Sequence, residues 1–210
     1  MVAARQLGLA DFGLFATALA AAALFQTLLD LTVEESLTKY GFRYVAAEDW
    51  GRLRRLFALG LQGKLAGGVL AAAALAALAP AADALFGAEG LVAPMLVVSL
   101  LPLVQAPENV GTSVLLVRGR YDLRGAYQSF SLALRLVGIL AGSRYGVVEA
   151  LAGIVAAQAV STVVISLAGL AAFRRFPVAP QAPLADDRRG VLSFVVQSSV
   201  ATGLVSLRTA

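Results

Sequence analysis

The sequence predicts an all-α protein, a polytopic transmembrane bundle of about six spans. Of its 210 residues, 59% are hydrophobic and only 14% are charged, whereas a soluble domain has about 25% charged residues. Apolar stretches recur that are long enough, at about 1.5 Å per residue, to cross most of a hydrocarbon layer of about 30 Å. Basic residues collect in alternate connections between these stretches, as expected of membrane topology.

The first expected span covers residues 11–31. It carries no formal charge from Phe12 to Leu29. Taken alone, this alanine-rich stretch fits a transmembrane helix or a buried helix of a soluble protein, because Ala contributes little to insertion. The similar stretches that follow favour the membrane.

The next connection, residues 32–55, is polar and rich in aromatic residues and Arg. Aromatic rings beside Arg clusters are typical of segments in the headgroup region, so we expect an interfacial connector here. The second span, residues 56–80, is rich in Ala and Gly, which allows neighbouring helices to approach closely.

The third span, residues 91–117, contains Pro94, Pro102 and Pro107. Proline lacks a backbone N–H, and its ring clashes with the carbonyl four residues earlier, so we expect a kink or break near Pro102 to Pro107. The remaining apolar stretches are residues 123–141, residues 147–173 and a run that starts at Val191 after a proline-rich linker.

The connections at residues 32–55, 118–124 and 174–189 hold twelve Lys and Arg residues, and those at 83–89 and 142–149 hold one, Arg144. This asymmetry identifies the basic connections as cytoplasmic and makes the N-terminus external. An external N-terminus without an earlier span, and an apolar run that stops at Ala210, lead us to expect a single transmembrane domain over residues 1–210 that lacks its first helix and is truncated in its seventh.

The composition excludes several classes of function. The chain has no Cys and no His, which excludes Cys/His zinc sites, thiol catalysis and Ser-His-Asp triads. We expect no enzyme activity, cofactor or metal. The net charge of +4 does not indicate nucleic-acid binding, because the basic residues lie in short clusters and not on one continuous face.

Three ionisable residues lie deep within the expected spans. Lys64 is nine residues from Arg55, Glu108 is ten from Arg118, and Arg135 is eleven from Arg124. At about 1.5 Å per residue each lies roughly 14–16 Å deep, near the middle of the layer. A charge at that depth should face the bundle interior or water.

Two interpretations of these charges remain open. One is a structural ion pair between Glu108 and either Lys64 or Arg135, which leaves one cation over. The other is a water-filled central cavity with net positive charge that accepts an anionic group, because the planar guanidinium of Arg can donate two parallel hydrogen bonds to a phosphate. Glu108, beside Pro107, is also a candidate cation or proton site.

Uncharged polar residues within the spans are weaker candidates, since they bond neighbouring helices as often as ligands. They are Gln62, Gln105, Asn109, Gln158 and Gln197. The expected cavity residues are Arg135, Lys64, Glu108, Gln105 and Asn109.

The N-terminal sequence contains an R-x-LG-x-x-D-F-G-x-F pattern. The residues that carry it are Arg5, Leu7, Gly8, Asp11, Phe12, Gly13 and Phe15. The pattern resembles a turn between the first two helices of the bacterial oligosaccharide flippases, which belong to the multidrug/oligosaccharidyl-lipid/polysaccharide exporter superfamily.

The resemblance implies half of a two-bundle exporter fold with a central cavity. It also implies translocation of polyprenyl-pyrophosphate-linked oligosaccharide across the bacterial cytoplasmic membrane for polysaccharide export. The expected partners are this lipid-linked substrate, membrane lipids and the polysaccharide polymerase and export machinery, with no nucleic acid. Lys64 and Arg135 would then attract the pyrophosphate.

Three alternatives to a flippase remain open. They are an ion-coupled drug exporter of the same superfamily with Glu108 as its coupling carboxylate, a membrane-embedded polymerase or glycosyltransferase, and a non-functional fragment. The short external connections disfavour the enzyme, which should carry catalytic residues in a large external loop.

Overall fold

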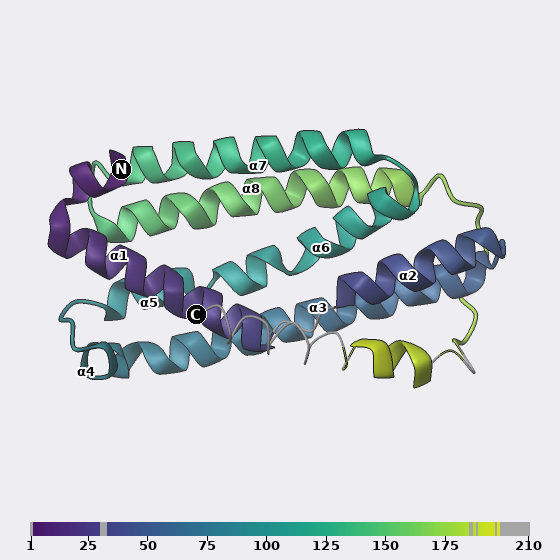
Figure 1. Cartoon of the computed structure of the whole chain (residues 1–210), viewed down its shortest axis with the longest axis horizontal. Coiled ribbons are helices and arrows are strands. Elements are labelled where there is room, and N and C mark those ends of the chain that lie inside the picture. Colours follow the sequence, from purple (N-terminus) through teal and green to yellow (C-terminus); the bar gives the residue numbers. More distant parts are fainter. Residues whose placement is uncertain (1, 30–32, 185–186, 188, 196, 198–210) are drawn as a thin grey trace.

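The computed structural model describes residues 2–29, 33–184, 187, 189–195 and 197. Within these ranges the chain forms α-helices and one 3-10 turn, and no strand. The helices lie side by side along the long axis of the molecule (Figure 1). The expected all-α helix bundle is therefore confirmed.

Helix α1 (Val2–Leu29) contains a sharp bend at Gly8, whose φ of 78° and ψ of 173° are not helical. A Cβ at Gly8 would meet no atom within 4 Å, so this position needs glycine for its backbone conformation and not for space. The bend separates the first turns from the apolar part of α1 (Figure 1), and it lies in the turn pattern at the N-terminus.

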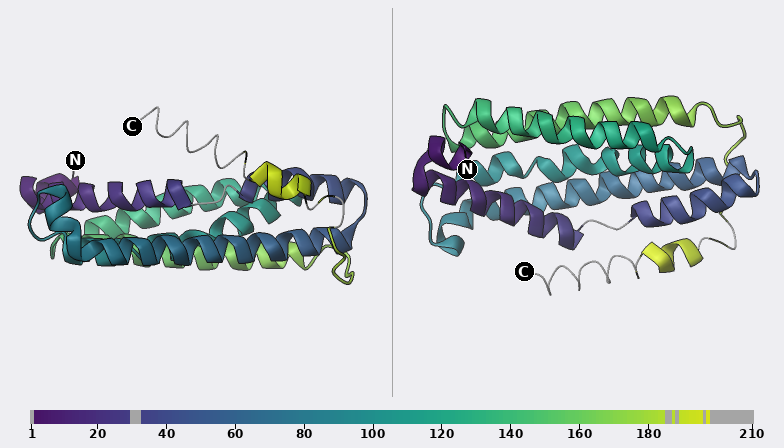
Figure 2. Two further views of the ribbon diagram at one scale, coloured as in Figure 1. Left: turned by 90° about the horizontal axis from the view of Figure 1, so that it is seen from below. Right: turned by 45° about the horizontal axis from the view of Figure 1, so that its top comes forward.

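Helix α2 (Val33–Ala46) packs along the first half of α3 (Trp50–Leu78), as both figures show (Figures 1 and 2). Its buried residues include Val33, Leu37, Tyr40 and Tyr44, which recur at helical spacing and form one face. The expected interfacial connector is thus wrong. This stretch forms a helix of the bundle, because its apolar face has α3 to pack against.

Between α3 and the next long helix the chain forms a 3-10 turn (Ala79–Ala81) and two short helices, α4 (Ala82–Phe86) and α5 (Val92–Val98). Helix α6 (Leu101–Val117) follows after a break at Ser99 and Leu100. Pro102 occupies the first turn of α6, where no backbone N–H is needed, and Pro107 stays inside the helix. The expected break therefore lies just before Pro102.

Helices α7 (Tyr121–Gly142) and α8 (Val147–Phe173) form a closely packed antiparallel pair (Figure 1). A Cβ added at Gly138 would meet the carbonyl of Gly153, and one added at Gly153 would meet the carbonyl of Gly138. The two backbones touch here because neither residue has a side chain.

In the part of the chain that the structure describes, four segments are long and apolar enough to cross a membrane: Gln6–Gln26, Trp50–Phe86, Val92–Val117 and Val147–Phe173. Residues 123–141, also expected to span, form most of α7, a 22-residue helix outside that set. The sixth expected run, from Val191, lies largely outside the described residues.

The basic connections meet at one end of the bundle, which we call the arginine-rich end. Here the end of α2, the start of α3, the end of α6, the start of α7 and the end of α8 come together (Figure 1). The linker after α8 returns to α3, where the Ala182 N–H donates to the Gly51 carbonyl at 3.2 Å. The basic connections, which alternate with non-basic ones along the sequence, thus lie together at one end of the bundle.

Candidate functional site

The apolar core of the bundle is interrupted at mid-length. One buried cluster lies toward the arginine-rich end and includes Leu53, Val114 and Ile165. A second lies toward the opposite end and includes Leu75 and Leu151. Between the two clusters α3, α6 and α8 carry polar side chains, which are Lys64, Gln105, Glu108, Asn109, Gln158, Ser161 and Thr162. We call this region the polar layer.

Lys64 pairs with Glu34, a carboxylate outside the set of residues predicted from the sequence. Its Nζ lies 2.7 Å from Oε2 of Glu34 on α2, and the two side chains are 2% and 34% exposed. Because Glu34 supplies a second anion to the polar layer, the expected surplus of one positive charge is wrong within the described part of the chain.

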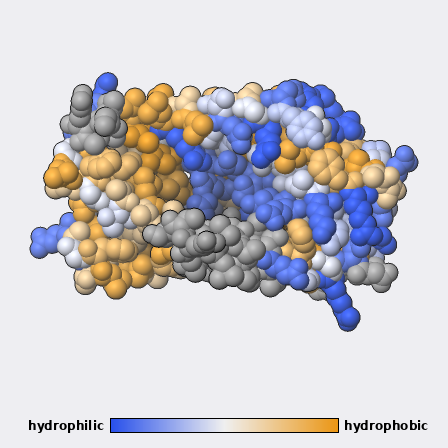
Figure 3. Space-filling model, in the orientation of Figure 1, coloured by the Kyte–Doolittle hydropathy of each residue, from blue (hydrophilic) through white to orange (hydrophobic). Residues whose placement is uncertain are grey.

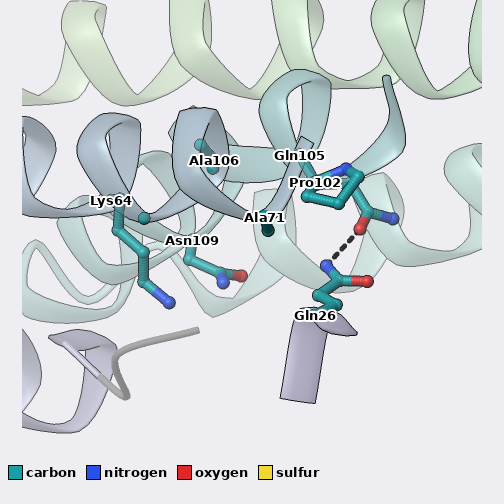
Figure 4. A pocket seen from close by; sticks show the side chains of 9 residues that line it. Gln26, Lys64, Ala71, Pro102, Gln105, Ala106 and Asn109 are labelled. Carbon is teal, nitrogen blue, oxygen red and sulfur yellow. Dashed lines mark hydrogen bonds between the residues drawn. The ribbon is translucent and has the colours of Figure 1, made fainter. Parts of the chain in front are cut away.

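Lys64, Gln105 and Asn109 line a small cavity with Gln26 of α1 (Figure 4). Gln26 donates a hydrogen bond to the Gln105 side-chain carbonyl. The cavity measures about 20 Å³, enough for a water molecule. Its remaining walls are small or proline residues, Gly67, Gly68, Ala71, Pro102 and Ala106, which allow α3 and α6 to approach closely.

Arg135 and Glu108 meet through a third residue. The Arg135 guanidinium donates to the Gln158 side-chain carbonyl, and the Gln158 amide nitrogen donates to the Glu108 carboxylate. That nitrogen also donates to Thr162 Oγ1 at 3.0 Å. Gln158 is fully buried, so it acts as a neutral bridge between two charges.

Neither form of the expected structural ion pair is present among the described residues, where Lys64 pairs with Glu34 and Glu108 accepts from Gln158. Helix α6 instead separates the five expected cavity residues into two groups. Gln105 and Asn109, four residues apart on one face, lie with Lys64, whereas Glu108 is bonded toward α8 and Arg135. The two groups share one level, since Glu108 and Asn109 are adjacent.

Hydrophilic residues line a hollow in the middle of one face of the molecule (Figure 3). Apolar surface covers much of the half away from the arginine-rich end. Gln105, Glu108, Asn109 and Arg135 are all partly exposed, so the polar layer is open to water or to a ligand in part and is not sealed like a core.

The roles of two residues, Glu34 and Gln158, are not predicted from the sequence. Glu34 lies in the expected connector, although the apolar spacing that begins at Val33 indicates a helix with Glu34 beside its buried face. In the sequence Gln158 does not differ from Gln62 and Gln197, both of which are exposed. Only the packing of α8 against α6 and α7 distinguishes it.

Comparison with known proteins gives one family. The family described as polysaccharide biosynthesis protein matches residues 1–204. No curated protein and no solved structure matches the chain significantly. The match covers the bent first helix, the polar layer and the apolar helices around it. The chain therefore belongs to the polysaccharide biosynthesis protein family, the family of bacterial polysaccharide flippases, and it is a membrane protein.

Proposed function

We propose that this chain forms part of a flippase of the bacterial cytoplasmic membrane that moves polyprenyl-pyrophosphate-linked oligosaccharide, and that it has no enzymatic activity. The observation that carries the proposal is the partly exposed polar layer at mid-length in a bundle of apolar helices. Charges at that depth are expensive and are typical of substrate pathways.

Arg135 is the residue best suited to the pyrophosphate. Its present acceptor is the neutral carbonyl of Gln158, and a phosphate oxygen is a stronger, charged acceptor that the guanidinium can bind in a bidentate manner. Glu108 keeps the amide N–H of Gln158 when Arg135 turns to phosphate. The carboxylate is therefore not left without a donor.

Lys64 has a different role in this proposal. Its ion pair with Glu34 must open before the ammonium can contribute to anion binding, so Lys64 is the weaker of the two cations. Gln105 and Asn109 carry amide groups that suit sugar hydroxyls, because they can both donate and accept. The lipid tail stays in the bilayer.

The test measures binding of polyprenyl-pyrophosphate oligosaccharide to the purified chain in nanodiscs. We expect Arg135→Gln to weaken binding at least tenfold, since a charge-assisted hydrogen bond contributes about 1.5–3 kcal/mol. Arg144→Gln is the matched control, because Arg144 is an exposed residue just after the far end of α7 and its replacement removes the same charge. Equal binding by wild type and Arg135→Gln would refute the proposed site.

A second arm uses a polyprenol-linked oligosaccharide without phosphate, to which wild type and Arg135→Gln should bind equally. In cells, the Arg135→Ala variant of a full-length homologue should lose complementation of polysaccharide export while keeping expression. Normal surface polysaccharide in that strain would also count against the proposal.

The partly exposed Glu108 carboxylate supports a second candidate, an ion-coupled exporter of small molecules. A carboxylate inside a bundle can take up and release a proton or cation. This function predicts that Glu108→Gln abolishes drug resistance conferred by a full-length homologue. It also predicts that the lipid-linked oligosaccharide does not bind.

A further inference from the structure

A second, larger groove lies between α3, α6 and α8, and it is separate from the polar layer. Its volume is about 570 Å³, within the range of about 300–1,000 Å³ typical of ligand sites. Its apolar lining consists of Phe57, Ala58, Leu61, Pro107, Val110, Gly111, Val114, Gly169, Leu170 and Phe173. Ser166, Arg54, Ala179 and Gln181 complete the wall.

The groove uses another face of α6 than the polar layer does. Pro107, Val110, Gly111 and Val114 recur at spacings of three and four residues, so they form one stripe of the helix. Asn109 lies on the side of Lys64. Figure 2 shows α3 and α8 in the layer opposite α1 and α2, and the groove lies between the two helices of that layer.

One end of the groove is cationic. Arg54 lines it and donates to the Pro177 carbonyl at 3.2 Å, with its guanidinium 5.4 Å from the Phe173 ring centroid. Among the residues that the structure describes, no carboxylate pairs with Arg54, and its Nε has no hydrogen-bond partner. Arg55, beside it, contacts the neutral side chain of Gln181 at 3.4 Å.

The apolar part extends from this cationic end toward the middle of the bundle. Leu61 follows Arg54 by seven residues on α3, about 10 Å along the helix. The groove thus combines a positive charge at the arginine-rich end with an apolar channel toward the middle of the bundle, which is the arrangement that a headgroup and an acyl chain need.

We propose that this groove binds one anionic glycerophospholipid, with an acyl chain along α6 and the phosphate at Arg54. A second copy of the chain packed symmetrically on this face is disfavoured as occupant, because it would bring a second Arg54 to the same place. The lipid tail of a transported substrate is disfavoured too, since its headgroup would lie at Arg135, which reaches α6 through Gln158 at Glu108 and not at the stripe of α6 that lines the groove. This lipid site does not depend on the proposed transport function.

Native mass spectrometry of the purified full chain tests the site, with dioleoylphosphatidylglycerol and dioleoylphosphatidylcholine as probes. The two lipids have the same acyl chains and differ in headgroup charge. We expect the wild-type chain to bind the anionic lipid about tenfold more tightly. Arg54→Gln should remove this preference, because it removes the cation that faces the phosphate.

Two further variants separate charge from shape. Arg175→Gln removes an exposed charge at the same end but not from the groove, and it should keep the preference. Ala58→Phe places a ring in the apolar channel and should weaken binding of both lipids about tenfold. Circular dichroism and gel filtration check that each variant is folded.

The proposal is overturned if wild type binds the two lipids equally, or if Arg54→Gln and Arg175→Gln lower the preference by the same factor. Unchanged lipid binding by folded Ala58→Phe would also overturn it, because the acyl chain would then lie elsewhere.

Discussion

The middle of the bundle and its arginine-rich end carry similar charged groups in different surroundings. In the middle, Lys64 is 2% exposed in its pair with Glu34, and Gln158 bridges Arg135 to Glu108. At the end, Arg43 pairs with Asp187 at 3.0 Å with 62% of its side chain exposed. A broken pair at the end can turn to water, whereas one in the middle leaves a buried charge. Depth therefore decides what each contact contributes.

The largest effect should come from Glu34→Gln. This change removes the Glu34 carboxylate from the buried ammonium of Lys64, and we expect a loss of about 3 kcal/mol in the free energy of unfolding. Denaturant unfolding in detergent, followed by helical circular dichroism, measures it. Glu35→Gln is the matched control, because Glu35 is the exposed neighbour and should change stability little.

The double variant Glu34→Gln/Lys64→Met sharpens this result. Since it removes both charges, it should recover most of the lost stability. Equal destabilisation by Glu34→Gln and Glu35→Gln would show that depth does not set the contribution of this pair.

A smaller loss, about 2 kcal/mol, is expected for Gln158→Leu. The variant removes a hydrogen bond from each of two charged groups, the Arg135 guanidinium and the Glu108 carboxylate, and a hydrogen bond to a charged group contributes about 1.5–3 kcal/mol. The same unfolding experiment applies. Gln62→Leu, at an exposed position of α3, is the control and should leave stability nearly unchanged. A similar loss in both variants would mean that the bridge contributes no stability.

At the arginine-rich end, Asp187→Asn should cost about 1 kcal/mol, and this cost should shrink as salt is added because exposed ion pairs are screened. Asp187 accepts from Arg43 and from Tyr44 and lies 3.8 Å from Arg52. Unfolding at low and high ionic strength measures the effect. If Asp187→Asn destabilises the protein equally at low and high salt, the contacts of Asp187 behave like the buried contacts in the middle of the bundle, and the expectation is wrong.

The smallest effect is confined to high pH. Burial and the hydrogen bond to Asp187 raise the pKa of Tyr44 at the end of α2 to about 12 from 10.0. A raised folded-state pKa stabilises the fold below the unfolded pKa, and this stabilisation is lost as pH rises from 10 to about 12. Tyr44→Phe has no phenol to ionise and therefore lacks this loss. Over this pH range its free energy of unfolding should fall by up to about 1 kcal/mol less than that of wild type. Tyr121→Phe, at an exposed position, should follow wild type. Parallel curves for Tyr44→Phe and wild type would contradict the expectation.

The sequence predicted those features that depend on position along a helix. Apolar length indicated four segments that the structure also has as long apolar helices, and counting residues from the arginines placed Lys64, Glu108 and Arg135 at a common level. It did not predict which direction a side chain takes around its helix. Lys64 was expected to share a cavity with Arg135, yet it pairs with Glu34 on the other side of α6. Gln158 likewise gained its role from the packing of three helices.

The contact between Gly138 and Gly153 bears on how such a bundle can move. Separating α7 from α8 at this point would lose the close packing of the two backbones that the two glycines allow. The two helices are therefore expected to travel together as one rigid hairpin when the hollow face changes shape. Any hinge would then lie outside the hairpin, at the connection from α6 to α7 and in the linker that follows α8.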